Sequence, residues 1–94
     1  MSDVFTNVEG ERAFWVSDGK VIHNLFELAV AFKDMKISTF KYHANKQKND
    51  FYEWVKNALD NKELAEQLAR TITKDKAELV VLRYIAEKLT QKEA

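Results

Sequence analysis

Residues 40–55 read FKYHANKQKNDFYEWV, and the rest of the chain is organised around this stretch. It contains five aromatic residues, one of the two histidines and several short polar side chains. Asn and Asp favour turns and helix starts because their side chains hydrogen-bond nearby backbone amides. We therefore predict a structural corner, in which apolar anchors on two helices are joined by a capped polar turn. Its residues are Phe40, His43, Asn45, Asn49, Asp50, Phe51 and Trp54.

The residues after this turn have the periodicity of three further helices. In the first of them, Asp50 and Glu53 are spaced as in a capping box. The last runs from Lys74 to about Gln91. The expected caps are Asn49 or Asp50, then Asn61 or Asp60, then Thr73. The predicted inner faces are Phe51, Trp54, Val55, Ala58 and Leu59 in the first helix, and Leu64, Ala65, Leu68 and Ile72 in the second.

The residues before the corner predict a β-hairpin. Ala13–Val16 is an apolar, β-prone run, and Val21-Ile22 would be the return strand. Between them, Asp18-Gly19 is a strong turn signal because both residues accept positive φ. Residues 1–10 have few apolar anchors, so we expect them to form a loose arm.

Two helix starts follow the hairpin. Asn24 and Glu27 are spaced as in a capping box, and Ser38 is expected to cap a short helix that ends near Ala44. The predicted buried face of the first helix is Leu25, Leu28, Ala29, Phe32 and Met35.

Residues 1–94 are thus predicted to form one mainly α-helical domain, a small bundle of about five helices behind an N-terminal β-hairpin. The hairpin covers residues 13–22 and the helices residues 24–91. Two glycines and no prolines are too few for a fold with many tight turns. Trp15 and Trp54 lie beside apolar neighbours, and we predict that both belong to the core.

The composition excludes several classes of protein. The chain has no cysteine, so disulfides, thiolate metal sites and cysteine nucleophiles are absent. Its acidic start does not resemble a signal peptide, and no apolar run has the length of a membrane span. The formal net charge is zero, which gives no general attraction to nucleic acid or anionic lipid. We expect a cytoplasmic protein that does not bind membranes.

His43 is the first candidate for chemistry, because imidazole titrates near neutrality and Asp50 could orient it as a general base. Neither a nucleophile nor a metal-ligand spacing accompanies this pair. We favour the simpler interpretation, in which His43 hydrogen-bonds the connector at residues 45–48. An enzyme that uses His43 and Asp50 remains an alternative, and neither a cofactor nor a metal is expected.

The segment 33–48 is basic, with five lysines and one acid, whereas residues 1–32 carry two bases and five acids. Lysines contact phosphates, and an exposed tyrosine could stack on a base. This segment could therefore bind nucleic acid or a phosphate ligand, although a solvated charged surface is the simpler interpretation. The residues concerned are Lys33, Lys36, Lys41, Lys46, Lys48 and Tyr42.

The centre of the last helix, Leu79–Leu82, is apolar on every side. One core face does not need that much apolar surface, so the helix is expected to have a second face for a partner. The favoured function is a non-enzymatic protein-interaction or regulatory module that could form a homodimer, in which free hairpin edges could also pair. The residues expected to meet the partner are Leu79, Leu82, Ala86 and Leu89.

The motif order also resembles a family of small prokaryotic domains of unknown function. The resemblance covers about residues 13–70 and is most specific in the H-x-N…N-D-F-x-x-W part. It implies a compact auxiliary module, either alone or appended to other proteins, and no known activity. The matching residues are Asp18, Gly19, Asn24, Leu25, Glu27, Leu28, Met35, Phe40, His43, Asn45, Asn49, Asp50, Phe51, Trp54, Leu64, Ala65 and Leu68.

Overall fold

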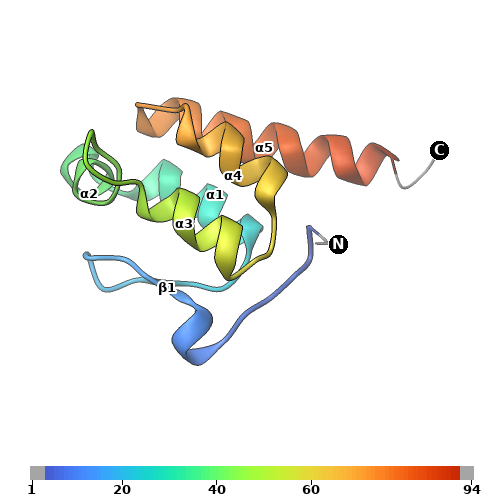
Figure 1. Cartoon of the computed structure of the whole chain (residues 1–94), viewed down its shortest axis with the longest axis horizontal. Coiled ribbons are helices and arrows are strands. Elements are labelled where there is room, and N and C mark those ends of the chain that lie inside the picture. The colour runs from blue at the N-terminus through green and yellow to red at the C-terminus, as the bar shows by residue number, and fades with distance from the viewer. Residues whose placement is uncertain (1–3, 92–94) are drawn as a thin grey trace.

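The computed structural model describes residues 4–91, which form five α-helices, a short 3-10 helix and a two-stranded hairpin. In Figure 1 the hairpin lies along one side of the molecule and α5 along the opposite edge. α5 packs mainly along α1, and α4 packs along α3. The predicted helical domain with an N-terminal hairpin is confirmed. The elements are the 3-10 helix Gly10–Arg12, β1 (Phe14–Trp15), β2 (Val21–Ile22), α1 (Leu25–Asp34), α2 (Ile37–His43), α3 (Asp50–Asn57), α4 (Lys62–Ala69) and α5 (Lys74–Gln91).

The hairpin is antiparallel and pairs Phe14 with Ile22. Its turn is longer than the sequence suggested. The carbonyl of Val16 accepts a hydrogen bond from the Gly19 amide, and the Val16 amide donates to the Lys20 carbonyl, both at 2.9 Å. Gly19 has φ of 98°, whereas Asp18 does not have positive φ. Only the glycine therefore uses the left-handed conformation, as in a three-residue hairpin loop with a bulge.

The two tryptophans differ in burial. Trp54 is 7% exposed, and its Nε1 donates to the Arg12 carbonyl at 2.7 Å. Trp15 is 64% exposed, so its predicted place in the core is wrong. Side chains alternate between the two faces of a strand, and Phe14 takes the inward position. Trp15 lies on the outer face, where its Nε1 donates to the Gly10 carbonyl at 3.3 Å.

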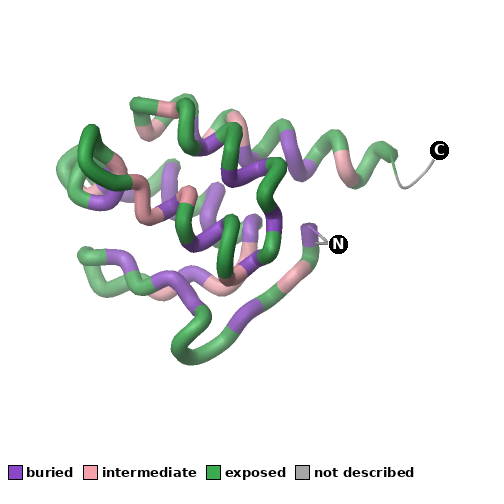
Figure 2. The backbone as a smooth tube through the Cα atoms, in the orientation of Figure 1, coloured by how far each residue is buried: buried purple, intermediate pink, exposed green. Residues whose placement is uncertain are grey.

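The N-terminal segment is packed against the domain. Val4 and Val8 are buried, and the Val8 amide donates to the His23 carbonyl at 2.9 Å. Figure 2 shows buried stretches along this segment of the backbone. The ring of Phe5 stacks on Phe26 with 5.5 Å between centroids. The predicted loose arm is therefore wrong for residues 4–8, and its first three residues lie outside the described range.

The starts of α1 and α2 follow different rules. Asn24 caps α1 and accepts the Glu27 amide at 2.8 Å, as predicted. The Glu27 carboxylate accepts the His23 amide, one residue earlier than in a standard capping box. α2 begins after Lys36, without a side-chain cap, so the predicted Ser38 cap is wrong. Only two residues link α1 to α2, and the helix has begun before Ser38 can cap it.

Asn49 caps α3, and its side chain accepts the Tyr52 amide at 3.0 Å. Asn49 is one of the two caps that the sequence allowed. The predicted capping box between Asp50 and Glu53 is wrong, because Asp50 is the first helical residue and Glu53 accepts from Asn57 instead.

α4 and α5 also begin at expected caps. Asn61 accepts the Leu64 amide at 3.1 Å, and Thr73 accepts the Lys76 amide at 3.2 Å. Ile72 is 81% exposed, so its predicted inward position is wrong. α4 ends at Ala69, three residues before Ile72, and the periodicity of the helix no longer applies there.

Phe51 is at the centre of the core. Its ring lies within 4.8–5.6 Å, centroid to centroid, of Phe14, Phe32, Phe40 and His43. These rings come from β1, α1 and α2, and Phe51 itself belongs to α3, so one residue joins the hairpin to three helices. Within residues 4–91, no helix combines the length and the apolar character needed to cross a membrane.

Candidate functional site

The outer face of α5 carries a line of apolar side chains, which we call the α5 seam: Leu79, Leu82, Ala86 and Leu89. The three leucines are 45%, 46% and 37% exposed, and Ala86 is also exposed. Spacings of three, four and three residues place them on one side of the helix. The inner face is buried separately, through Ala77, Val81, Tyr84 and Ile85. α5 therefore has two apolar faces, and the domain covers only one of them.

Contacts from the inner side hold α5 in this orientation. The Lys74 ammonium donates to the carbonyls of Phe32 and Lys33, at 2.9 and 3.2 Å, and so binds the C-terminal end of α1. Near the middle of α5, the buried Tyr84 hydroxyl exchanges hydrogen bonds with the Asn61 side chain at 3.0 and 3.3 Å. These contacts would break if α5 rotated to bury its outer leucines. The exposure of the seam is therefore a fixed property of the domain.

Charged side chains of opposite sign flank the α5 seam. With about 3.6 residues per turn, Glu78 falls along one side of it and Lys76 and Arg83 along the other. None of these three side chains has an ion-pair partner in the part of the chain that the structure describes. An apolar line with an acid on one side and bases on the other is typical of helices that pack against another helix.

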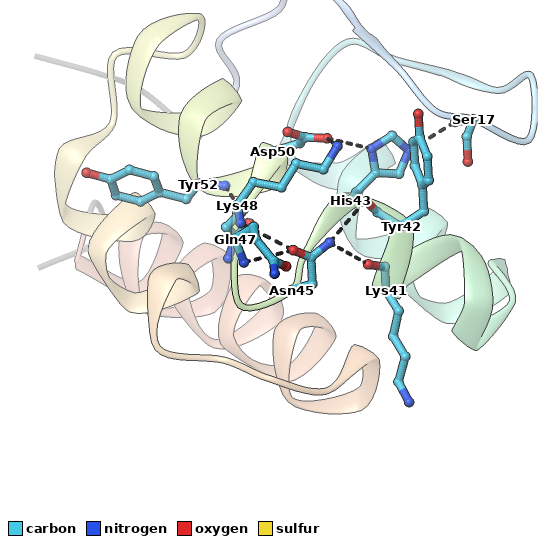
Figure 3. A network of polar contacts seen from close by, with 10 residues as sticks. Ser17, Lys41, Tyr42, His43, Asn45, Gln47, Lys48, Asp50 and Tyr52 are labelled. Carbon is cyan, nitrogen blue, oxygen red and sulfur yellow. Dashed lines mark hydrogen bonds and ion pairs between the residues drawn. The ribbon is translucent and has the colours of Figure 1, made fainter.

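His43 is buried in the corner, and both of its ring nitrogens are occupied (Figure 3). The Ser17 amide donates to Nε2 at 3.0 Å, so Nε2 is an acceptor and the proton of the neutral ring is on Nδ1. Nδ1 donates to the Asp50 carboxylate at 2.9 Å. The ring thus ties the hairpin to the start of α3, rather than bonding the connector at residues 45–48 as we expected.

The carboxylate of Asp50 also meets the Lys48 ammonium at 3.0 Å. Burial raises the pKa of Asp50, but hydrogen bonds from His43 and Lys48 and the charges of these partners outweigh it. The net effect is a pKa of Asp50 below its ordinary value. A surface hollow of about 510 Å³ reaches Asp50 beside Glu53, and His43 does not line it. In this geometry the imidazole has no free nitrogen that faces open space.

Two asparagines shape the turn between α2 and α3. Asn45 donates to the Lys41 carbonyl at 3.0 Å and accepts the Gln47 amide at 2.9 Å (Figure 3). Asn49 caps α3 and also donates to the Leu68 carbonyl at 3.2 Å, which ties the turn to α4. Phe40 and Phe51 are buried and stack on each other next to His43, whereas the buried Trp54 packs on Phe14 of the hairpin. The structure thus brings together six of the residues predicted for the corner and places Trp54 against the hairpin.

The predicted lysines are exposed around α2. Lys48 is occupied, because its ammonium pairs with Asp50 and lies 4.6 Å from the centre of the Tyr42 ring. Tyr42 is 59% exposed, but this contact covers one face of its ring. The other four lysines have no ion pair within residues 4–91: Lys33, Lys36, Lys41 and Lys46.

A second surface feature was not anticipated from the sequence. An open hollow of about 430 Å³ lies between β2 and α1. The exposed side chains of Phe26 and Val30 line it, together with Lys20 and Glu27 at its polar positions. Phe26 and Val30 are four residues apart and lie off the buried stripe of α1, which is the signal that could have indicated an exposed apolar surface.

Comparisons with protein-family models, with curated proteins and with solved structures found no significant match. The resemblance to a family of small prokaryotic domains therefore stays a prediction. Within residues 4–91, no group of three or more His, Asp or Glu side chains could hold a metal ion.

Proposed function

We propose that this protein is a non-enzymatic protein-interaction module that binds a partner helix along the α5 seam, and that a second copy of the chain is one such partner. The observation that supports it is the line of three partly exposed leucines on a helix whose other face is already buried. The cytoplasmic location expected from the sequence remains part of this proposal.

Single exposed apolar side chains are common on soluble proteins and need no explanation. The α5 seam differs because its members are aligned at the spacing that helix–helix interfaces use. Full burial of a leucine stabilises by about 1.5–3 kcal/mol relative to leaving it exposed, and each seam leucine retains a little under half of its exposure. Burial of each seam leucine against a partner helix would thus stabilise the complex by about 1 kcal/mol.

Sedimentation equilibrium of the wild-type chain and two variants tests this proposal. We expect the wild type to exceed its monomer mass of 11.0 kDa as concentration rises through the micromolar range. Leu82→Lys should remain a monomer, because a charge in the middle of the seam must be desolvated on association. Ile37→Lys is the matched control, since Ile37 is 63% exposed and lies on α2, away from the seam.

Both substitutions replace outward-pointing side chains, so the urea midpoint of each variant should stay close to that of the wild type. This comparison separates loss of association from loss of folding. A wild-type chain that remains monomeric at high micromolar concentration would contradict self-association. Equal association of the wild type and Leu82→Lys would remove the seam from the proposal.

A second candidate function is binding of nucleic acid or a phosphate ligand by the exposed lysines around α2. It is supported by the four lysines there that have no ion pair within residues 4–91. Fluorescence anisotropy with a labelled DNA duplex at low salt tests it. We expect Lys41→Glu to weaken binding and Lys62→Glu, at an exposed position of α4, to leave it unchanged. No binding by the wild type at low salt would remove this candidate.

A further inference from the structure

We infer that two copies of the chain pack their α5 seams in parallel, with Glu78 of each copy beside Arg83 of the other. This inference rests on the proposed self-association through the same surface. It adds the orientation of the two helices and the polar contacts that select it.

The seam has the geometry of a short two-helix interface. Leu79 and Ala86 are seven residues apart, as are Leu82 and Leu89, so the four residues take the a and d positions of two successive heptads. In a parallel pair, equivalent residues of the two copies meet in the same layer. Ala86, the smallest member, lets the two backbones approach most closely.

The flanking charges distinguish the two orientations. Glu78 precedes the a residue Leu79 and is at a g position, whereas Arg83 follows the d residue Leu82 and is at an e position. In a parallel pair, a g residue faces the e residue five positions later in the other helix, so Glu78 faces Arg83 of the second copy. Twofold symmetry repeats this contact on the other side.

An antiparallel pair would place e positions against e positions. Arg83 would then approach Arg83 of the second copy, close to the symmetry axis, whereas Glu87 on the same side lies at an outer b position. Like charges at this distance oppose association. In the parallel pair the two Asp75 side chains meet one heptad before Leu82, at the end of the seam, where each is 92% exposed and 4.0 Å from the Lys74 ammonium, so their repulsion is well screened. Neither Glu78 nor Arg83 has an ion-pair partner within residues 4–91, so both are available for a contact between copies.

The surroundings of α5 permit this packing. The domain occupies the inner face of α5, through Ala77, Val81 and Ile85, and α5 runs along the edge of the molecule (Figure 1). Because the helix is already held in the domain, association has no helix-folding cost. The seam is only about 15 Å long at 1.5 Å per residue, so we expect a reversible dimer rather than a permanent one.

Disulfide trapping tests the orientation directly, because the chain has no cysteine of its own. A disulfide needs Cα atoms about 4.4–6.8 Å apart. Only a parallel pair places residue 86 of both copies in one layer, so Ala86→Cys should form a covalent dimer under mild oxidation. Ile37→Cys, at a 63% exposed position of α2, is the control for random collision, and Ala86→Cys should cross-link at least about tenfold faster.

A charge exchange gives a second, independent readout. In the parallel arrangement, Glu78→Arg and Arg83→Glu should each raise the dissociation constant by about threefold to tenfold, and the double variant should restore it. The same pattern should fade at high salt. In an antiparallel pair, Arg83→Gln would instead strengthen association, because it removes a like-charge contact.

The outcomes separate the two proposals. A wild-type chain that sediments only as a monomer overturns both self-association and orientation. A dimer that Leu82→Lys abolishes, but that cross-links only between a Leu82→Cys copy and an Ala86→Cys copy, is antiparallel. That result overturns the inference and leaves the proposed function standing. Rapid cross-linking of Ala86→Cys, with rescue by the double charge exchange, supports the parallel arrangement.

Discussion

Replacing His43 with phenylalanine should destabilise the domain by about 2 kcal/mol. The substitution keeps an aromatic ring among its neighbours, since the His43 ring lies 5.1 Å from Phe14 and 5.5 Å from Phe51. It removes two hydrogen bonds, the one from the Ser17 amide and the one to the Asp50 carboxylate. These bonds connect the hairpin to α3, and the phenyl ring cannot replace them.

The magnitude follows from the type and exposure of each bond. A bond to a neutral amide contributes about 1 kcal/mol, and one to a charged group about 1.5–3 kcal/mol. Both partners have some access to water, because Ser17 is exposed and the Asp50 side chain is 33% exposed. Asp50 also keeps its contact with Lys48. The two losses therefore sum to about 2 kcal/mol. This is a large part of the total free energy of unfolding, which is roughly 5–14 kcal/mol for 94 residues.

Urea unfolding followed by far-UV circular dichroism measures this loss. The midpoint should fall at an unchanged denaturant slope, and the thermal midpoint should fall by about 10 °C. Asp50→Asn and the double variant that combines it with His43→Phe complete a double-mutant cycle. This cycle isolates the coupling free energy between His43 and Asp50. Stability within about 0.5 kcal/mol of the wild type would refute the reasoning and reopen the interpretation of His43 as a general base.

Three further outcomes are expected. The pKa of Glu27 is lowered mainly by the His23 hydrogen bond, and that of Asp50 is also low, so both carboxylates stabilise the fold above their unfolded-state pKa. Unfolding free energy should therefore fall with pH below about 5 in acid titrations, less steeply in Asp50→Asn. Asn61→Ala removes the cap of α4 and leaves the buried Tyr84 hydroxyl unpaired, so urea unfolding should show a loss of about 2–4 kcal/mol, more than Tyr84→Phe. Gly19→Ala should cost about 1–2 kcal/mol in the same assay through its φ of 98° alone, since no atom beyond the adjoining residues lies within 4 Å of the added carbon.

Local signals in the sequence predicted most of the helices. Asn24, Asn49 and Asn61 each cap a helix because a short side chain can bond an amide three residues later, which depends only on nearby sequence. The excess of apolar residues in the last helix likewise predicted an outer face with exposed leucines. A helix of one domain has one buried face, and the remaining apolar residues must lie elsewhere.

Predictions about which side chains face the core were less reliable. Trp15 and Phe14 are neighbours of similar apolar character, and only the contact of the hairpin with α3 decides which of them is buried. Val4 and Val8 belong to a polar-looking segment, yet the domain offers them a surface and the His23 carbonyl offers an acceptor. Sequence periodicity contains no information about which strand face meets a distant helix.

The sequence alone determined the helix starts other than that of α2, the position of the hairpin, the residues of the α5 seam and most of those in the corner. The tertiary structure decided what those residues do. Ser17 lies 26 positions before His43, and Tyr84 lies 23 positions after Asn61, so neither pairing was visible along the chain. Folding brought these groups together, engaged both nitrogens of His43 with the chain's own groups, and held the seam leucines outward. Contacts between distant segments decide this, because burial and hydrogen bonding depend on position in space rather than on order in the sequence.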